Sequence, residues 1–182
     1  MSRAVKRVLK AVSSIMVGIV IVLAILLVGV RAVGLQPYTI LSPSMKDVYP
    51  TGSLIYVKKA DPASLDVKDV ITFRISDNMT ATHRIIELVP DENDPSVVRF
   101  RTKGDNNDSP DGALVEYADV LGTPVFCIPL LGFLAQYIQS PSGSIVAIAI
   151  GIASIVFVSI VDIVTDDKDK KRDKGEKQNE KA

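Results

Sequence analysis

Three residue types that could together perform nucleophilic chemistry occur far apart in this chain. The first is a pair of serines in the segment Ser-Pro-Ser-Met at 42–45, a few residues beyond a long apolar run. A serine hydroxyl is a poor nucleophile at neutral pH and needs a positioned base to take its proton. The segment therefore predicts a catalytic serine only if the rest of the chain supplies a base and a group that orients it.

The base could be His83, the single histidine of the chain. A lone histidine is more often an ordinary surface or core residue, and the sequence leaves that alternative open. The period-two pattern of its segment puts His83 on the same strand face as Ala81 and Ile85. Most neighbours on that face are uncharged, which favours a neutral imidazole that can accept a proton.

The orienting group could come from the loop at 102–112, which offers the carboxylates of Asp105, Asp108 and Asp111. A carboxylate held against the far imidazole nitrogen fixes the tautomer and stabilises the imidazolium that forms. The same aspartates could instead form an Asx-turn or a surface calcium loop, although the loop lacks the glycine and the distant glutamate of an EF-hand. From spacing alone, a catalytic triad is one hypothesis among these.

The composition argues against redox, metal and nucleic-acid chemistry. Cys127 is the only cysteine, so no intrachain disulfide can form, and its apolar segment predicts a small buried side chain. The Cys/His spacings of a metal site are absent, and we expect neither a metal nor a cofactor. Residues 32–141 carry nine Lys/Arg against fourteen Asp/Glu, so no nucleic-acid partner is expected.

The elements that must position these residues begin with a membrane anchor. Residues 11–30 carry no charge, and about 20 helical residues rise about 30 Å, the thickness of a hydrocarbon core. The run is longer than the apolar region of a cleaved signal peptide. We expect an uncleaved helix over 11–31, with removal near Ala32 as the alternative. The basic arm at 1–10 predicts a cytoplasmic N-terminus.

A second apolar segment, 143–161, predicts another transmembrane helix over 142–164. The tail at 165–182 contains seven basic residues, which also favour the cytoplasm, and its low complexity predicts disorder. Both ends then lie inside. We expect a multi-pass protein of the cell membrane or the endoplasmic reticulum membrane, with residues 32–141 as a catalytic domain on the extracytoplasmic side.

The outer domain is predicted to be mostly β, built from antiparallel strands. Alternation indicates strands at 53–59, 69–76, 80–89 and 97–103, separated by turn signals, and no strong helical pattern is present. The uncharged stretch 120–138 contains two prolines. It predicts a last core strand, an apolar surface resting in the outer leaflet, or both.

Four short motifs occur in the order found in the signal peptidase I family: Ser-Pro-Ser-Met at 42–45, GSLIYV at 52–57, THRI at 82–85 and KGDNNDSPD at 103–111. Each motif is weak alone, but four in order between two apolar segments are specific. The chain resembles the serine–histidine branch of the endoplasmic reticulum, archaea and some Gram-positive bacteria, whereas the other branch has lysine where His83 stands. The resemblance covers about residues 36–125 and implies an antiparallel β catalytic domain flanked by two transmembrane helices.

The resemblance implies roles for individual residues. Ser44, directly before methionine, corresponds to the family's nucleophile, and His83 corresponds to the base. The family's two aspartates correspond to Asp105 and Asp111. Asp111 is the better match for the acid of the triad, and Asp105 is then an accessory that shapes the site. At the substrate, we expect two further residues of the same segment: Ser42, whose hydroxyl would help to hold the oxyanion, and Met45, which would contact substrate or lipid unless it packs in the core.

The chain departs from the family pattern around the nucleophile. Pro43 stands where glycine is usual, Lys46-Asp47 where Glu-Pro is usual, and Ser53 where aspartate often follows the glycine. A proline fixes φ and removes a backbone donor, so Pro43 is expected to stiffen the nucleophile turn. None of these changes removes a group that the chemistry requires.

The activity implied by the resemblance is endoproteolytic removal of N-terminal signal peptides from exported preproteins, after small residues as in A-x-A. The expected partners are preprotein signal peptides, the lipid bilayer and, in a complex, a translocon or other peptidase subunits. The alternatives are a non-catalytic accessory subunit and a related serine protease with other targets. A lysine base is disfavoured, because Lys58 and Lys59 lie in the motif after the nucleophile rather than at the base position.

Overall fold

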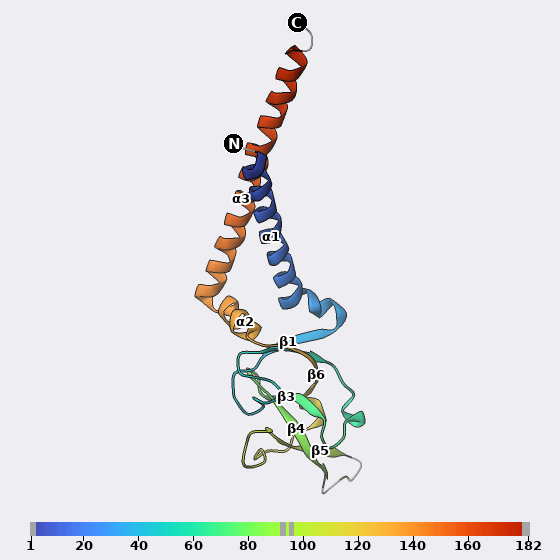
Figure 1. Cartoon of the computed structure of the whole chain (residues 1–182). Helices are drawn as coiled ribbons and strands as arrows, with labels where there is room; N and C mark the ends of the chain where they lie inside the picture. Colours follow the sequence, from blue (N-terminus) through green and yellow to red (C-terminus); the bar gives the residue numbers. More distant parts are fainter. Residues whose placement is uncertain (1–2, 92–93, 95–96, 180–182) are drawn as a thin grey trace. The chain divides into compact units, whose positions relative to one another are not determined.

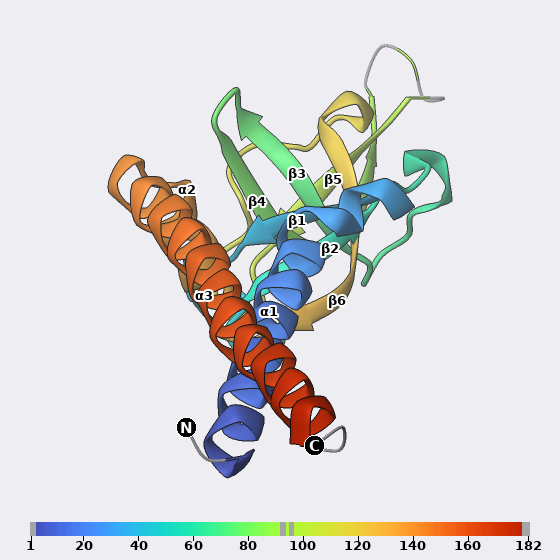
Figure 2. The same ribbon diagram turned by 90° about the horizontal axis from the view of Figure 1, so that it is seen from above.

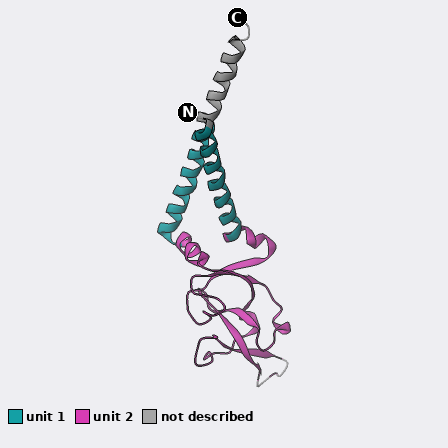
Figure 3. Cartoon of the chain, viewed as in Figure 1, with its two compact units in different colours: residues 1–26, 140–182 teal, residues 27–139 magenta. Residues whose placement is uncertain are grey.

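The computed structural model describes the backbone at residues 3–91, 94 and 97–179, and the side chains at 4–91, 94 and 97–163. The chain divides into two compact units, one formed by residues 1–26 and 140–182 and the other by residues 27–139 (Figure 3). The second unit contains the sheet and every residue that the sequence analysis assigns to chemistry.

The first unit consists of two long helices, α1 (Arg3–Leu27) and α3 (Pro141–Asn179) (Figure 1). Their apolar parts, Ala4–Leu27 and Pro141–Ile163, have mean hydropathies of 2.6 and 2.7 and are long enough to cross a membrane. In each helix only 6% of the apolar 18-residue stretch is buried inside the protein, whereas the core helix of a soluble domain is mostly buried. The expectation of two apolar helices that could span a membrane is confirmed.

Both helices extend beyond their apolar parts into charged sequence. α1 begins at Arg3, within the basic arm, and α3 continues to Asn179, within the charged tail. Side chains after Ile163 lie outside the described residues. The disorder expected at 165–182, the sidedness of both ends and the boundaries of the outer domain therefore stay predictions.

The second unit contains a six-stranded antiparallel sheet with the strand order β1-β2-β6-β3-β4-β5 (Figure 1, Figure 2). The strands are β1 (Leu35–Thr39), β2 (Leu54–Lys58), β3 (Val70–Ser76), β4 (Met79–Pro90), β5 (Val98–Lys103) and β6 (Val120–Ile128). Short 3-10 helices lie at η1 (Gly29–Val33), η2 (Pro62–Ser64) and η3 (Tyr117–Asp119). Alternation predicts β2 to β5 to within one residue at each end, and the mostly β fold is confirmed.

The β3–β4 hairpin sets the direction in which His83 points. Ile71 pairs with His83 and Phe73 with Ala81, so these four side chains share one face of the sheet. That face packs on the core of the unit, where Ile71 and Ile85 are fully buried. The ring of Phe73 meets the imidazole edge to face, with 6.2 Å between centroids. His83 is therefore a core-facing residue at the border of the site.

Two prolines lie inside strands at positions where a missing N–H is tolerated. Pro37 is in β1, which is an edge strand of the sheet. Pro124 is in the central strand β6, opposite Val57, where the register shifts between Tyr56 and Val57. Such an irregularity removes the requirement for a ladder hydrogen bond, so β6 forms in spite of its proline.

The stretch 120–138 is part strand and part helix. β6 occupies 120–128, as one of the sequence interpretations has it, but α2 (Leu131–Gln139) follows as a helix that the sequence analysis does not predict. α2 packs closely on β2, because Gly132 lies against the Ser53 carbonyl, where an added Cβ would be 2.4 Å from the oxygen. Leu54 and Tyr56 of β2 and Ala135 of α2 form one buried cluster. The helix was missed because its nine residues are fewer than the window of about 11 or more over which a helical period is read.

Candidate active site

The segment that carries Ser44 is a loop held closed at its base. Ile40 donates its N–H to the Ser53 carbonyl at 2.9 Å, and Gly52 donates to the Ile40 carbonyl at 2.8 Å. Inside the loop, the Met45 carbonyl accepts from the N–H of Tyr49 at 2.7 Å. These bonds make a compact turn that extends β1 towards β4.

The buried side chain of Met45 anchors this turn. Its side chain is 1% exposed, and its Sδ accepts a hydrogen bond from the Asp105 N–H at 3.2 Å. The core-packing alternative therefore describes Met45 better than contact with lipid. Because Met45 follows Ser44 directly, its burial limits the freedom of the neighbouring serine.

The loop after β5 packs directly on Ser44. The Asn106 N–H donates to the Ser44 carbonyl at 2.9 Å, and the Asn106 side chain donates to Asp47 at 2.8 Å. Gly104 lies so close that an added Cβ would be 2.8 Å from the Ser44 Cβ. Only a glycine permits this approach. The sequence analysis did not identify Asn106, whose role depends on a contact between distant segments.

Ser44, His83 and Asp111 form one hydrogen-bonded row. The Ser44 Oγ lies 3.0 Å from His83 Nε2, and His83 Nδ1 lies 2.6 Å from Asp111 Oδ2. The side chains of His83 and Asp111 are 13% and 22% exposed. Since an ionised carboxylate only accepts hydrogen bonds, Nδ1 carries the proton when the imidazole is neutral, and the Nε2 lone pair faces the serine.

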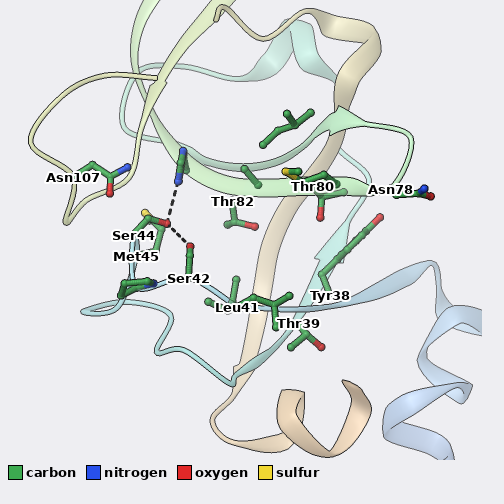
Figure 4. Close-up of a pocket in the computed structure, with 16 residues that line it drawn as sticks. Tyr38, Thr39, Leu41, Ser42, Ser44, Met45, Asn78, Thr80, Thr82 and Asn107 are labelled. Atoms are coloured by element: carbon green, nitrogen blue, oxygen red, sulfur yellow. Dashed lines mark hydrogen bonds between the residues drawn. The ribbon is translucent and has the colours of Figure 1, made fainter. Parts of the chain in front are cut away.

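Ser42 lies beside the Ser44 hydroxyl. Its Oγ is 3.0 Å from the Ser44 Oγ, and Figure 4 shows the two serines side by side. When the Ser44 hydroxyl donates to His83, the Ser42 hydroxyl is the donor to the Ser44 oxygen. Pro43 between them has no N–H to contribute.

Asp105 makes a different contact from Asp111. Its carboxylate forms a two-pronged ion pair with Arg84, with Nε–Oδ1 at 2.8 Å and Nη2–Oδ2 at 2.6 Å. The hydrogen bond from Arg84 lowers the pKa of the Asp105 carboxyl below its usual value, against a smaller opposing effect of burial. Asp108, the third aspartate of the loop, is exposed.

Thr102 is a further residue of the site that the sequence analysis did not single out. Its Oγ1 donates to Asp111 Oδ2 at 2.6 Å, and its carbonyl accepts from the Asp111 N–H at 2.9 Å. Thr102 pairs with Ile85 across β4 and β5 and so shares the face of His83. That alternation was the available signal, but a threonine in a strand is common and did not stand out.

A cavity of about 660 Å³ opens in front of Ser44 and His83. It lies between the segment from Tyr38 to Met45 and the β3–β4 hairpin, and the close-up in Figure 4 shows side chains of both elements along it. A second cavity of about 370 Å³ adjoins it and shares Ile75, Ala81 and His83.

The remaining reactive side chains are placed away from this row. Cys127 is partly buried and packs on a cluster that contains Ile40 and Ile55. Lys58 is exposed at the end of β2, where it pairs with Leu35 at the other end of β1 from the serine turn. Within the part of the chain that the structure describes, no three His, Cys, Asp or Glu side chains are grouped so that they could hold a metal ion.

Comparison with known proteins identifies a relative. No family model matches the chain. Over 110 residues the chain is 38% identical to signal peptidase I W of Bacillus subtilis (strain 168), a stretch that is 56% of this chain and 56% of the relative. The chain is related to signal peptidase I. Because it spans little more than half of that signal peptidase I, we treat the activity, substrates and partners of the whole protein as proposals.

Proposed function

We propose that the protein is a membrane-bound serine endopeptidase that removes N-terminal signal peptides from exported preproteins. The observation that carries the proposal is the row from Ser44 through His83 to Asp111, with contacts of 3.0 and 2.6 Å, in a chain related to signal peptidase I. A nucleophile, a base and an orienting carboxylate are the parts that acyl transfer by serine requires.

In this mechanism His83 is the general base. Its Nε2 takes the Ser44 proton while Oγ attacks the scissile carbonyl, and the resulting imidazolium is stabilised by Asp111. The tetrahedral intermediate collapses as His83 protonates the leaving amine, which leaves an acyl-enzyme on Ser44. Neutral His83 then takes a proton from a water that attacks the ester, and it returns this proton to the Ser44 oxygen as the ester bond breaks and the signal peptide leaves with a free carboxylate.

The developing oxyanion needs donors in place before the reaction. The Ser44 N–H and the Ser42 hydroxyl are the donors that we assign to it, and the 3.0 Å between the two serine oxygens supports the second assignment. Both belong to one short turn whose backbone is held by Met45 and Asn106. Catalysis thus benefits from a rigid turn rather than from a mobile one.

The substrate would lie as an extended strand in the larger cavity, between the segment that continues β1 and the edge of the β3–β4 hairpin. Apolar side chains of Ile40, Leu41, Ile75 and Ala81 line the cavity near the reactive pair. Shallow apolar walls favour small side chains before the cut, as in A-x-A sequences. Main-chain bonding of an extended peptide would give affinity without dependence on sequence.

A membrane location agrees with the apolar surface of the second unit. Phe126, Leu130, Phe133 and Tyr137, on β6 and around α2, are 59%, 70%, 50% and 50% exposed. These four large apolar side chains lie within one short stretch of the chain, which favours a surface that meets lipid or another protein. We propose that this surface rests in the outer leaflet and that both chain ends are cytoplasmic. A translocon or other peptidase subunits are proposed partners in a complex.

The test is cleavage of a preprotein by the full chain in lipid bilayers. We expect the wild type to release the signal peptide, the Ser44→Ala variant to be inactive, and Ser64→Ala, an exposed serine of η2, to match the wild type. Equal results for wild type and Ser44→Ala, whether both cleave or neither does, would favour a non-catalytic accessory subunit. Cleavage of internal loops but not of signal peptides would indicate a serine protease with other targets.

A further inference from the structure

We propose that Thr102 is a positioning residue of this site, whose hydroxyl holds the Asp111 carboxylate in the orientation that accepts the Nδ1–H of His83. The inference rests on the proposed function and adds a fourth side chain to the row. Thr102 would touch neither substrate nor the reacting atoms, and it would act only through Asp111.

Two hydrogen bonds join Thr102 to Asp111. The hydroxyl donates to Oδ2 at 2.6 Å, and the Thr102 carbonyl accepts from the Asp111 N–H at 2.9 Å. The oxygen that takes the hydroxyl is the same one that lies 2.6 Å from His83 Nδ1. The backbone hydrogen bond fixes the position of the Asp111 main chain, and the hydroxyl fixes the orientation of its carboxylate.

Burial makes the hydroxyl a better anchor than water. Thr102 is 0% exposed, whereas the Asp111 side chain is 22% exposed and can meet solvent. The terminal torsion of an aspartate is soft, so a partly exposed carboxylate turns easily unless it is held. A β-branched threonine is stiff at χ1, and a buried hydroxyl without a partner is costly. The hydroxyl therefore stays directed at Asp111.

The strand register places Thr102 where this contact is possible. Ile85 pairs with Thr102, and Ile85 and His83 share a face of β4, so the hydroxyl points to the side of the imidazole. The segment that carries Asp111 runs along the outer edge of β5, the edge that no other strand covers in the part of the chain that the structure describes. There Phe100 and Val115 exchange hydrogen bonds of 2.9 and 2.8 Å. A slip of one residue in β5 would turn Thr102 to the opposite face.

Loss of the hydroxyl would act on the tautomer of His83. A carboxylate that turns towards solvent no longer accepts from Nδ1, and the proton then divides between the two ring nitrogens. Only the Nδ1–H form presents a lone pair to Ser44. We expect kcat to fall roughly 10- to 100-fold, less than the ~10²–10⁴-fold that general base catalysis supplies in full.

The experiment uses the full chain in lipid nanodiscs with ¹⁵N-labelled histidine. His83 is the only histidine, so one pair of ring nitrogen signals reports its tautomer directly. Thr102→Val keeps the shape without the hydroxyl, and Thr102→Ser keeps the hydroxyl. Thr72→Val is the matched control, because Thr72 is 1% exposed and bonds to Thr82 at 2.8 Å instead of to Asp111.

We expect Thr102→Val to lose the fixed Nδ1–H signal of His83 and to lower kcat with little change in KM. Thr102→Ser and Thr72→Val should keep the wild-type signal. An unchanged signal in Thr102→Val, or equal loss in Thr102→Ser, would overturn the role of Thr102. These signals do not depend on turnover. An inactive wild type with a Thr102-dependent signal would therefore count against the proposed function alone.

Discussion

Arg84 donates hydrogen bonds to both carboxylate oxygens of Asp105, at 2.8 and 2.6 Å, and also donates to the Lys68 carbonyl at 2.8 Å. The pair ties the loop after β5 to β4 one residue beyond His83. Asn106 of the same loop donates to the Ser44 carbonyl, whereas Asp111 contacts the imidazole itself. The two aspartates of one loop thus make separate contacts.

This separation predicts the ranking of two substitutions. Asp111→Ala should lower kcat by about 10⁴-fold, because an imidazole without its carboxylate loses the productive tautomer. Asp105→Ala should only weaken cleavage, since it loosens the loop without touching His83. Initial rates of preprotein cleavage by the full chain measure both, with Asp108→Ala, an exposed residue, as the control. The reverse order would exchange the roles of the two aspartates.

The same ion pair predicts a dependence of stability on pH. Arg84 lowers the pKa of the Asp105 carboxyl in the folded protein, below about 3.9 in the unfolded chain. The pair therefore stabilises the fold fully above that unfolded value, and the effect is lost as pH falls through the lower folded pKa. The thermal midpoints of wild type and Asp105→Asn should differ at about pH 7 and converge as pH falls through the lowered folded pKa of Asp105. A difference that grows on acidification would contradict this.

Ser42 provides a test of oxyanion stabilisation. Its hydroxyl lies 3.0 Å from the Ser44 Oγ, and loss of one oxyanion donor typically lowers kcat by about 10²–10³-fold. We expect Ser42→Ala to show such a loss with KM unchanged and Ser42→Thr to retain most activity. Steady-state kinetics on a peptide with an A-x-A site separates the two constants. A rise in KM at constant kcat would instead assign Ser42 to substrate binding.

Gly104 tests the contact between the loop and the nucleophile. A Cβ there would be 2.8 Å from the Ser44 Cβ and 2.9 Å from the Ser44 carbonyl, so Gly104→Ala must displace the serine. A displacement of about 1 Å costs on the order of 10²-fold in rate. Gly112→Ala, where a Cβ meets nothing within 4 Å, is the matched control. Equal rates for the two variants would show that the contact does not matter for cleavage.

Much of this architecture can be predicted from the sequence because it depends on local pattern. Alternation locates β2 to β5, and two uncharged runs locate the long helices. The resemblance to signal peptidase I selects Ser44, His83 and Asp111, which the structure brings within hydrogen-bonding distance. Spacing alone leaves a catalytic triad as one of several hypotheses, because the three segments are far apart in the chain.

Features that depend on long-range contacts were not predictable. The insertion of β6 between β2 and β3 pairs it with two strands that each lie more than forty residues earlier in the chain. α2 is short, and Gly132 packs closely against the carbonyls of Gly52 and Ser53, directly before β2, a contact that the sequence does not reveal. Thr102 and Asn106 are ordinary residue types whose roles appear only when the loop meets Ser44 and His83.

The covalent acyl-enzyme on Ser44 can be sought directly. The full chain in lipid bilayers would be mixed with a preprotein, quenched in acid within the first turnover and digested for mass spectrometry. If Ser44 is the nucleophile, a signal-peptide acyl ester forms on Ser44 and is absent from Ser44→Ala. Cleavage with the acyl group on another residue, such as Cys127 or Lys58, or cleavage that persists in Ser44→Ala, would contradict it.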